Sequence, residues 1–94
     1  MMTQTELEKL RVETAETRTV FVEVELELER ATRKFGKFNS AHEGYAILLE
    51  EVDELWDEVK KKPDNRFILD MRKEAIQVAA MALRFARDIC GTKN

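Results

Sequence analysis

An acidic run between residues 50 and 58 is the part of the sequence whose residue types could do chemistry. It reads EEVDELWDE and holds six carboxylates in nine positions, and the next basic residue is Lys60. Carboxylates three or four residues apart on one helix repel each other, so an acidic helix usually interleaves lysine or arginine. The run is therefore either a solvated helix face, which is the common case, or a set of ligands for a cation.

Helical periodicity places a further carboxylate in an apolar setting. On a wheel of about 100° per residue, Glu51 and Glu54 share one flank of their helix, with Glu51 at the border of its apolar stripe. On the next helix, Glu74 projects among apolar residues that lie within about 60° of it: Phe67, Met71, Val78, Met81 and Phe85. Because a buried unpaired carboxylate costs several kcal/mol, Glu74 needs a partner. Mg²⁺ prefers carboxylate oxygens and is a suitable one.

Three long helices are expected to position these groups. Glycines and the single proline divide the chain into segments 4–34, 41–62 and 66–90, and a capping box from Ser40 to Glu43 marks the start of the second. The first segment also alternates polar and apolar residues as a strand would, but helical stripes fit it as well, and we predict a helix. The predicted fold is all-α: three long helices, with room for a short fourth, in an antiparallel bundle completed by oligomerisation.

Length and composition limit the class of protein. The 94 residues are 44% hydrophobic and 37% charged, with a net charge of −3, which indicates one small helical domain. So small a monomer has little stability to spare, and we predict a homo-oligomer, a dimer or tetramer. The mild charge argues against nucleic acid as a partner, and lone Cys90 and His42 exclude a disulfide framework and a multi-cysteine zinc site. Without a long apolar run or a signal peptide, we expect a cytoplasmic protein with no membrane partner.

The two acidic helices carry a recognisable pattern. The stretch HEGYAILLEEVDELWDEVKKKP, followed by MRKEAIQVAAMALRFARDI, resembles the MazG-like branch of the all-α nucleoside triphosphate pyrophosphohydrolases, over about residues 30–90. That family carries EExxE on one helix and ExxD on the next. Glu50, Glu51 and Glu54 match the first motif, and Glu74 matches the first acid of the second. Gln77 departs from the pattern, which has Asp there, and removes one negative charge.

The resemblance implies a single MazG-like helical domain over residues 1–94 that hydrolyses a nucleoside triphosphate between its α- and β-phosphates. The products would be pyrophosphate and a monophosphate, and the cofactor Mg²⁺ or Mn²⁺. Glu51, Glu54 and Glu74 would be the metal ligands. Glu50 would hold a second ion or orient the attacking water, and Gln77 would be a weak ligand or support one. Such an enzyme serves nucleotide pool sanitation or balance.

Substrate contacts are predicted in the segment RATRKFGKFNSAH, whose cations suit phosphates and whose aromatic rings, amide and imidazole suit a base: Arg30, Arg33, Lys34, Lys37, Phe35, Phe38, Asn39 and His42. The plain alternative is a helix C-terminus that carries cations, with Phe35 and Phe38 in the core. A second function also fits the sequence: a catalytically inactive MazG-like module with a binding or assembly role. The missing acid at Gln77 favours that alternative.

Overall fold

The structure, a computed structural model, describes residues 1–91 of the chain. It contains three long helices, α1 (Gln4–Phe35), α2 (Ala41–Val59) and α3 (Ile68–Asp88), and one 3-10 turn, η1 (Pro63–Asn65). The described residues include no strand, so the all-α prediction and the choice of a helix for the first segment are confirmed. None of these helices is long and apolar enough to cross a membrane.

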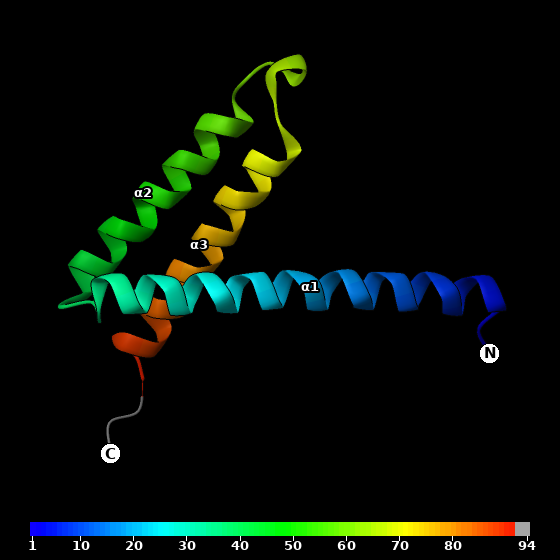
Figure 1. The fold of residues 1–94 in the computed structure, drawn as a ribbon, viewed down its shortest axis with the longest axis horizontal. Helices are drawn as coiled ribbons and strands as arrows, with labels where there is room; N and C mark the ends of the chain where they lie inside the picture. Colours follow the sequence, from blue (N-terminus) through cyan, green and yellow to red (C-terminus); the bar gives the residue numbers. More distant parts are fainter. Residues whose placement is uncertain (92–94) are drawn as a thin grey trace.

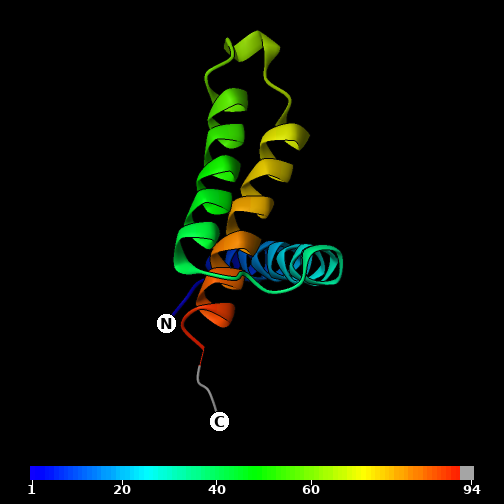
Figure 2. The same cartoon turned by 90° about the vertical axis from the view of Figure 1, so that its left-hand side faces the viewer.

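The helices are arranged as a pair with a third helix across it. α2 and α3 lie side by side and are joined through η1, and α1 crosses them at a steep angle (Figures 1 and 2). α3 packs against both α1 and α2, whereas the N-terminal half of α1 extends away from the pair (Figure 1). The Cα radius of gyration is 16.7 Å, while a compact chain of this length would have about 12 Å. A single chain therefore does not close into a compact globule.

Local signals in the sequence set the helix ends that place the acidic residues. The Ser40 hydroxyl accepts a hydrogen bond from the Glu43 N–H (3.1 Å), as the capping box predicts. The Glu43 carboxylate returns to Asn39 instead of Ser40, accepting from its backbone N–H (3.3 Å) and its side-chain amide (3.0 Å). Gly36, with a φ of 73°, ends α1 in a conformation that glycine adopts without steric cost. The start of α2 is thus well defined by the local sequence.

The core of one chain is small. Five apolar residues are buried where α1, the loop after it and α3 meet: Val24, Ala31, Phe38, Ala80 and Met81. The apolar stripe of α2 is only partly covered, because α1 packs against α3 and not against α2. Its outer side is a row of exposed side chains spaced three or four residues apart, here called the α2 apolar face: Tyr45, Leu49, Val52 and Trp56.

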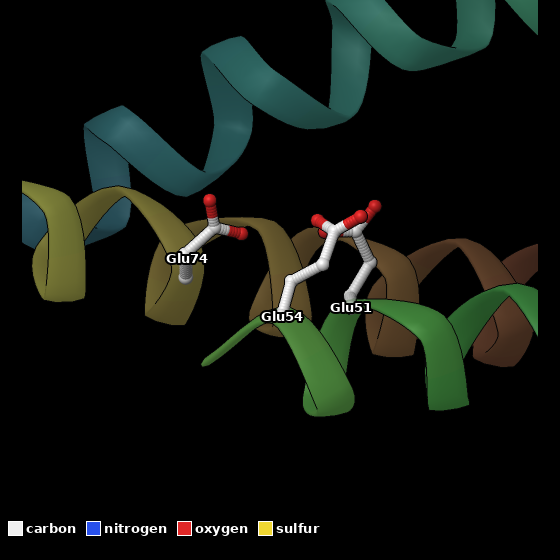
Figure 3. Close-up of side chains that lie close together, drawn as sticks. All are labelled: Glu51, Glu54 and Glu74. Carbon is white, nitrogen blue, oxygen red and sulfur yellow. The ribbon is translucent and has the colours of Figure 1, made fainter. Parts of the chain in front are cut away.

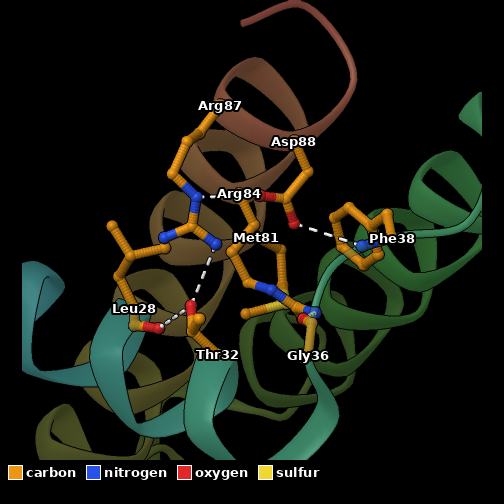
Figure 4. A network of polar contacts seen from close by, with 8 residues as sticks. All are labelled: Leu28, Thr32, Gly36, Phe38, Met81, Arg84, Arg87 and Asp88. Carbon is orange, nitrogen blue, oxygen red and sulfur yellow. Dashed lines mark hydrogen bonds and ion pairs between the residues drawn. The ribbon is translucent and has the colours of Figure 1, made fainter.

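A buried arginine ties α3 to the end of α1 (Figure 4). Arg84 is 2% exposed; its Nη2 donates to the Gly36 carbonyl (2.9 Å), and its guanidinium lies 4.1 Å from the centre of the Phe38 ring. One turn later, Asp88 accepts from the Phe38 N–H (3.1 Å) and from Arg87 Nε (2.8 Å). Burial raises the pKa of Asp88, but these hydrogen bonds outweigh it and hold the pKa below its ordinary value. The loop that leads into α2 is thereby fixed to α3.

Candidate metal centre

Three carboxylates from two helices lie near one another, with Glu51 and Glu54 together and Glu74 to one side (Figure 3). Glu51 and Glu54 project from α2, and Glu74 projects from α3; one oxygen of each lies within 4.8 Å of the others. The spacing of three on α2 puts its two acids on one flank, and the packing of α2 against α3 brings that flank to Glu74. The structure therefore brings together the three side chains predicted as metal ligands, here called the carboxylate cluster.

The other four acids of the acidic run lie outside the carboxylate cluster. Glu58 forms an ion pair with Lys61 and Asp57 with Lys60, both at 2.8 Å, where the lysines follow the end of α2. Two more acids, Glu50 and Asp53, are exposed on α2. The run is thus a mixture of paired, solvated and clustered carboxylates, and Glu50, predicted to orient a water or hold a second ion, is separate from the cluster.

The carboxylate cluster fits a hard divalent cation. Roughly 2.0–2.1 Å separates Mg²⁺ from its oxygens, which puts the ligand oxygens of an octahedron about 2.9 to 4.1 Å apart. Oxygens within 4.8 Å of one another reach that geometry after a small closure of the side chains. No ion pair among the described residues includes Glu51, Glu54 or Glu74. Carboxylate oxygens that carry negative charge and form no ion pair with a basic side chain suit Mg²⁺ or Mn²⁺.

The electrostatics of Glu51 follow from this crowding. Burial, and then the charge and hydrogen bond of Glu54, raise the pKa of Glu51 to about 7. The negative charges of Glu74 and Glu27 add to the shift. A carboxyl with such a pKa is partly protonated at neutral pH, so a cation that binds there must displace a proton.

Glu74 is less buried than its apolar neighbours on the helical wheel indicate. It is partly buried, and its neighbour Phe67 lies exposed at the start of α3. Burial, and then the charge and hydrogen bond of Glu54, still raise the pKa of Glu74 above its ordinary value. Glu74 was expected to be buried or nearly so; the structure has it partly buried, and the expected conflict between its charge and its surroundings is present.

The metal-free protein is expected to lose stability as the pH rises from about 4.5 to about 7. In that window, the folded state keeps a proton on Glu51 that the unfolded chain releases, so raising the pH favours unfolding. Saturating Mg²⁺ should oppose this loss because it stabilises the ionised carboxylates. Thermal unfolding across this window, with EDTA and with Mg²⁺, measures the effect, and Glu51→Gln is the control that should flatten it. A metal-free Tm whose pH dependence is the same in both proteins would contradict the assignment.

Gln77 stands between the two helices of the carboxylate cluster. Its amide oxygen would repel carboxylate oxygens, so the favourable orientation turns Nε2 toward them. In this orientation, Nε2 donates to Glu51 Oε2 (2.9 Å) and to Glu74 Oε2 (3.0 Å). The residue that departs from the family pattern thus contacts two of the three clustered acids.

α1 contributes groups beside the cluster, and among them Arg30 was predicted as a substrate contact. Two guanidinium nitrogens of Arg30 donate to the two carboxylate oxygens of Glu27, at 2.6 and 2.8 Å. Glu27 has the largest effect in raising the pKa of Arg30, and the negative charge of Glu51 adds to it. A groove of about 590 Å³ runs between α1 and α3 and reaches Gln77. Its charged lining comprises Glu23, Glu27, Arg30, Arg72 and Lys73. Only the crossing of α1 over α3 assembles this groove, and no local motif encodes that crossing.

The other predicted substrate contacts lie apart from the carboxylate cluster within one chain. Arg33, Lys34 and Lys37 are exposed around the end of α1, and Asn39 is bound to Glu43. His42 lines a small apolar cavity beside Ala41, Tyr45 and Phe85. His42 precedes Glu51 by nine residues. It therefore lies about 14 Å from Glu51 along the axis of α2 and on roughly the opposite side of the helix. These substrate contacts stay a prediction, and within one chain the structure does not gather them at the cluster.

Comparison of the chain with models of protein families, with curated proteins and with solved structures finds no match. The likeness to MazG-like proteins therefore rests on the quoted motifs. The geometry of Glu51, Glu54 and Glu74 is compatible with that likeness, because the motifs place acids on two adjacent helices and the structure has them within 4.8 Å.

Proposed function

We propose that this chain is a Mg²⁺-dependent nucleoside triphosphate pyrophosphohydrolase of the MazG-like kind, with a role in nucleotide pool sanitation or balance. The observation that carries the proposal is the carboxylate cluster: acids at the two motif positions lie together on α2 and α3, and none of them forms an ion pair within the described residues. A solvated acidic face would spread its charges apart, whereas these side chains crowd together in a partly buried place.

In this proposal, Glu51, Glu54 and Glu74 hold the cation, and each must be ionised to do so. Bound Mg²⁺ supplies neutralisation of phosphate charge and activation of a water. Water attacks the α-phosphorus and gives up a proton to solvent, the P–O bond from the α-phosphorus to the oxygen that bridges to the β-phosphate breaks, and pyrophosphate leaves with the electron pair. The groove between α1 and α3 adjoins the cluster, and its Lys73 suits the phosphates of a bound nucleotide, whereas its Arg72 is paired with Glu23 (2.9 Å).

Pyrophosphate release tests the proposal. Purified protein with Mg²⁺ is incubated with a panel of canonical and modified ribo- and deoxyribonucleoside triphosphates, and pyrophosphate and inorganic phosphate are measured separately. The proposal expects pyrophosphate and a monophosphate from at least one member of the panel, and none in EDTA. Release of inorganic phosphate alone would indicate a different reaction, and no release from any nucleotide would remove the enzyme proposal.

The second candidate is an inactive MazG-like module with a binding or assembly role, which Gln77 favours because an amide replaces the expected carboxylate. The Gln77→Asp variant separates the two candidates. It restores one negative oxygen ligand, so an enzyme weakened by its missing acid should bind metal more tightly and hydrolyse faster. If neither the wild type nor the folded, metal-bound Gln77→Asp variant releases pyrophosphate, the inactive module is the better account.

We also propose that a second copy of the chain covers the α2 apolar face, giving a homodimer or a dimer of dimers. Trp56 is 58% exposed there, and its row continues through Val52, Leu49 and Tyr45. A contiguous exposed apolar row is uncommon on monomers, and the open shape of one chain leaves it uncovered. A self-complementary face of this kind suits the two-fold symmetry of most homo-oligomers.

Sedimentation at micromolar concentration is expected to show a species of at least twice the 11.0 kDa mass of one chain. The Trp56→Lys variant should weaken the association by roughly 2 kcal/mol or more, because it replaces the largest side chain of the apolar row with a charge. Arg18→Ala, on the exposed part of α1, is the matched control and should associate as the wild type does. A wild type that sediments only as an 11.0 kDa species would contradict the proposed dimer.

A further inference from the structure

Gln77 supplies an amide group that joins a carboxylate of α2 to a carboxylate of α3. Its Nε2 carries two hydrogens and meets Glu51 Oε2 at 2.9 Å and Glu74 Oε2 at 3.0 Å, so each hydrogen has one acceptor. Neither carboxylate forms an ion pair with a basic residue of the described chain. The amide is therefore the neutral group that holds these two acids together without a cation.

A cation and the Gln77 amide compete for the same positions. A hydrogen bond places its hydrogen about 1.9–2.0 Å from the accepting oxygen, and Mg²⁺ lies about 2.0–2.1 Å from a ligand oxygen. An ion held by the Oε2 atoms of Glu51 and Glu74 would thus take the space of the two Nε2 hydrogens. Their partial positive charge would also repel it. An aspartate at this position would offer no hydrogens and would leave the metal-free cluster with a fourth negative charge.

We propose that Gln77 is a positioning residue that bridges Glu51 and Glu74 in the metal-free protein and must turn its Nε2 away when a divalent cation binds. The residue then does more than replace a lost ligand, because it keeps the carboxylate cluster assembled while the site is without metal. The bridge itself is independent of the enzyme proposal, whereas the competition with a cation rests on the metal site that the proposed function requires.

Hydrogen exchange of the glutamine side chains tests this directly, because the chain contains only two glutamines, Gln4 and Gln77. In protein labelled with side-chain ¹⁵N-glutamine, the Gln77 amide protons of the metal-free state should exchange about tenfold or more slowly than those of Gln4. Gln4 is exposed at the start of α1 and serves as the internal reference. Saturating Mg²⁺ should remove most of this difference and leave the Gln4 signals unchanged.

Two variants assign the signals. Gln77→Met has a similar length and no amide, so it should delete the protected pair; if it fails to fold, Gln4→Ser leaves Gln77 as the single glutamine. Equal exchange of both amides in metal-free protein would overturn the bridge. Protection that persists at a Mg²⁺ concentration where calorimetry shows full binding would overturn the competition. Protection with no calorimetric metal binding at all would reject the proposed function and the competition while supporting the bridge.

Discussion

The Glu51→Gln variant is expected to keep the fold and to lower kcat/KM for nucleotide hydrolysis by about 100-fold or more. Even the mutation of residues that only hydrogen-bond to metal ligands commonly lowers metal affinity or activity by about 10–100-fold. Glutamine preserves the length and shape of the side chain and removes the charge at the most crowded point of the carboxylate cluster. Above its pKa of about 7, Glu51 carries the negative charge that a cation would bind. The measurement is steady-state pyrophosphate release at saturating Mg²⁺.

Asp53→Asn is the matched control for this variant. Asp53 lies two residues from Glu51 on α2 and is exposed. Its replacement by asparagine also removes one negative charge, but outside the cluster. It should keep activity within a small factor of the wild type. Glu51→Gln should also raise the Tm of metal-free protein above pH 7, because it relieves repulsion among the three acids. Equal activity of Glu51→Gln and the wild type would show that hydrolysis does not depend on this cluster.

The Arg84→Ala variant is expected to lower the free energy of unfolding by about 3 kcal/mol. It removes the hydrogen bond to the Gly36 carbonyl and the contact with the Phe38 ring, and it leaves a cavity at a side chain that is 2% exposed. The cost of burying the guanidinium works in the other direction, since its Nε has no hydrogen-bond partner. Alanine loses the packing as well as the charge, so the loss should prevail.

Urea denaturation at one fixed protein concentration measures this change, with two comparisons. Arg84→Met fills most of the space without a charge, so it should cost less than half as much as the alanine variant. Arg18→Ala, on the exposed part of α1, should stay within about 0.5 kcal/mol of the wild type. An Arg84→Ala variant as stable as Arg18→Ala would mean that the buried network in Figure 4 does not hold α3 to the end of α1.

Much of the helical structure could be predicted because its signals are local. Gly36, the capping box at Ser40 and the proline at position 63 mark the breaks, and the helices begin and end within three residues of the predicted segments. The strand-like alternation in the first segment did not prevail, because the same residues also give continuous helical stripes. The crossing of α1 over α3 could not be predicted, because it depends on which of two apolar stripes packs inward.

The candidate site divides in the same way. The convergence of Glu51, Glu54 and Glu74 follows from the spacing of the acids on two adjacent helices, and the structure has all three together. Of the groove residues on α1, Arg30 was predicted as a substrate contact, whereas Glu23 and Glu27 were not foreseen, because they reach the site only through the helix crossing. The bridging position of Gln77 was also missed: the sequence shows an amide in place of an acid, but only the distances show which acids it contacts.

Calorimetric titration of metal-free protein with Mg²⁺ and Mn²⁺ tests the central claim, that the carboxylate cluster is a divalent-metal site. The wild type should bind the cation and release protons near pH 7, because the raised pKa of Glu51 leaves it partly protonated there. Glu74→Ala removes the ligand from α3 and should bind at least about tenfold more weakly. Absence of binding to the wild type, or equal affinity in the folded Glu74→Ala variant, would contradict the claim.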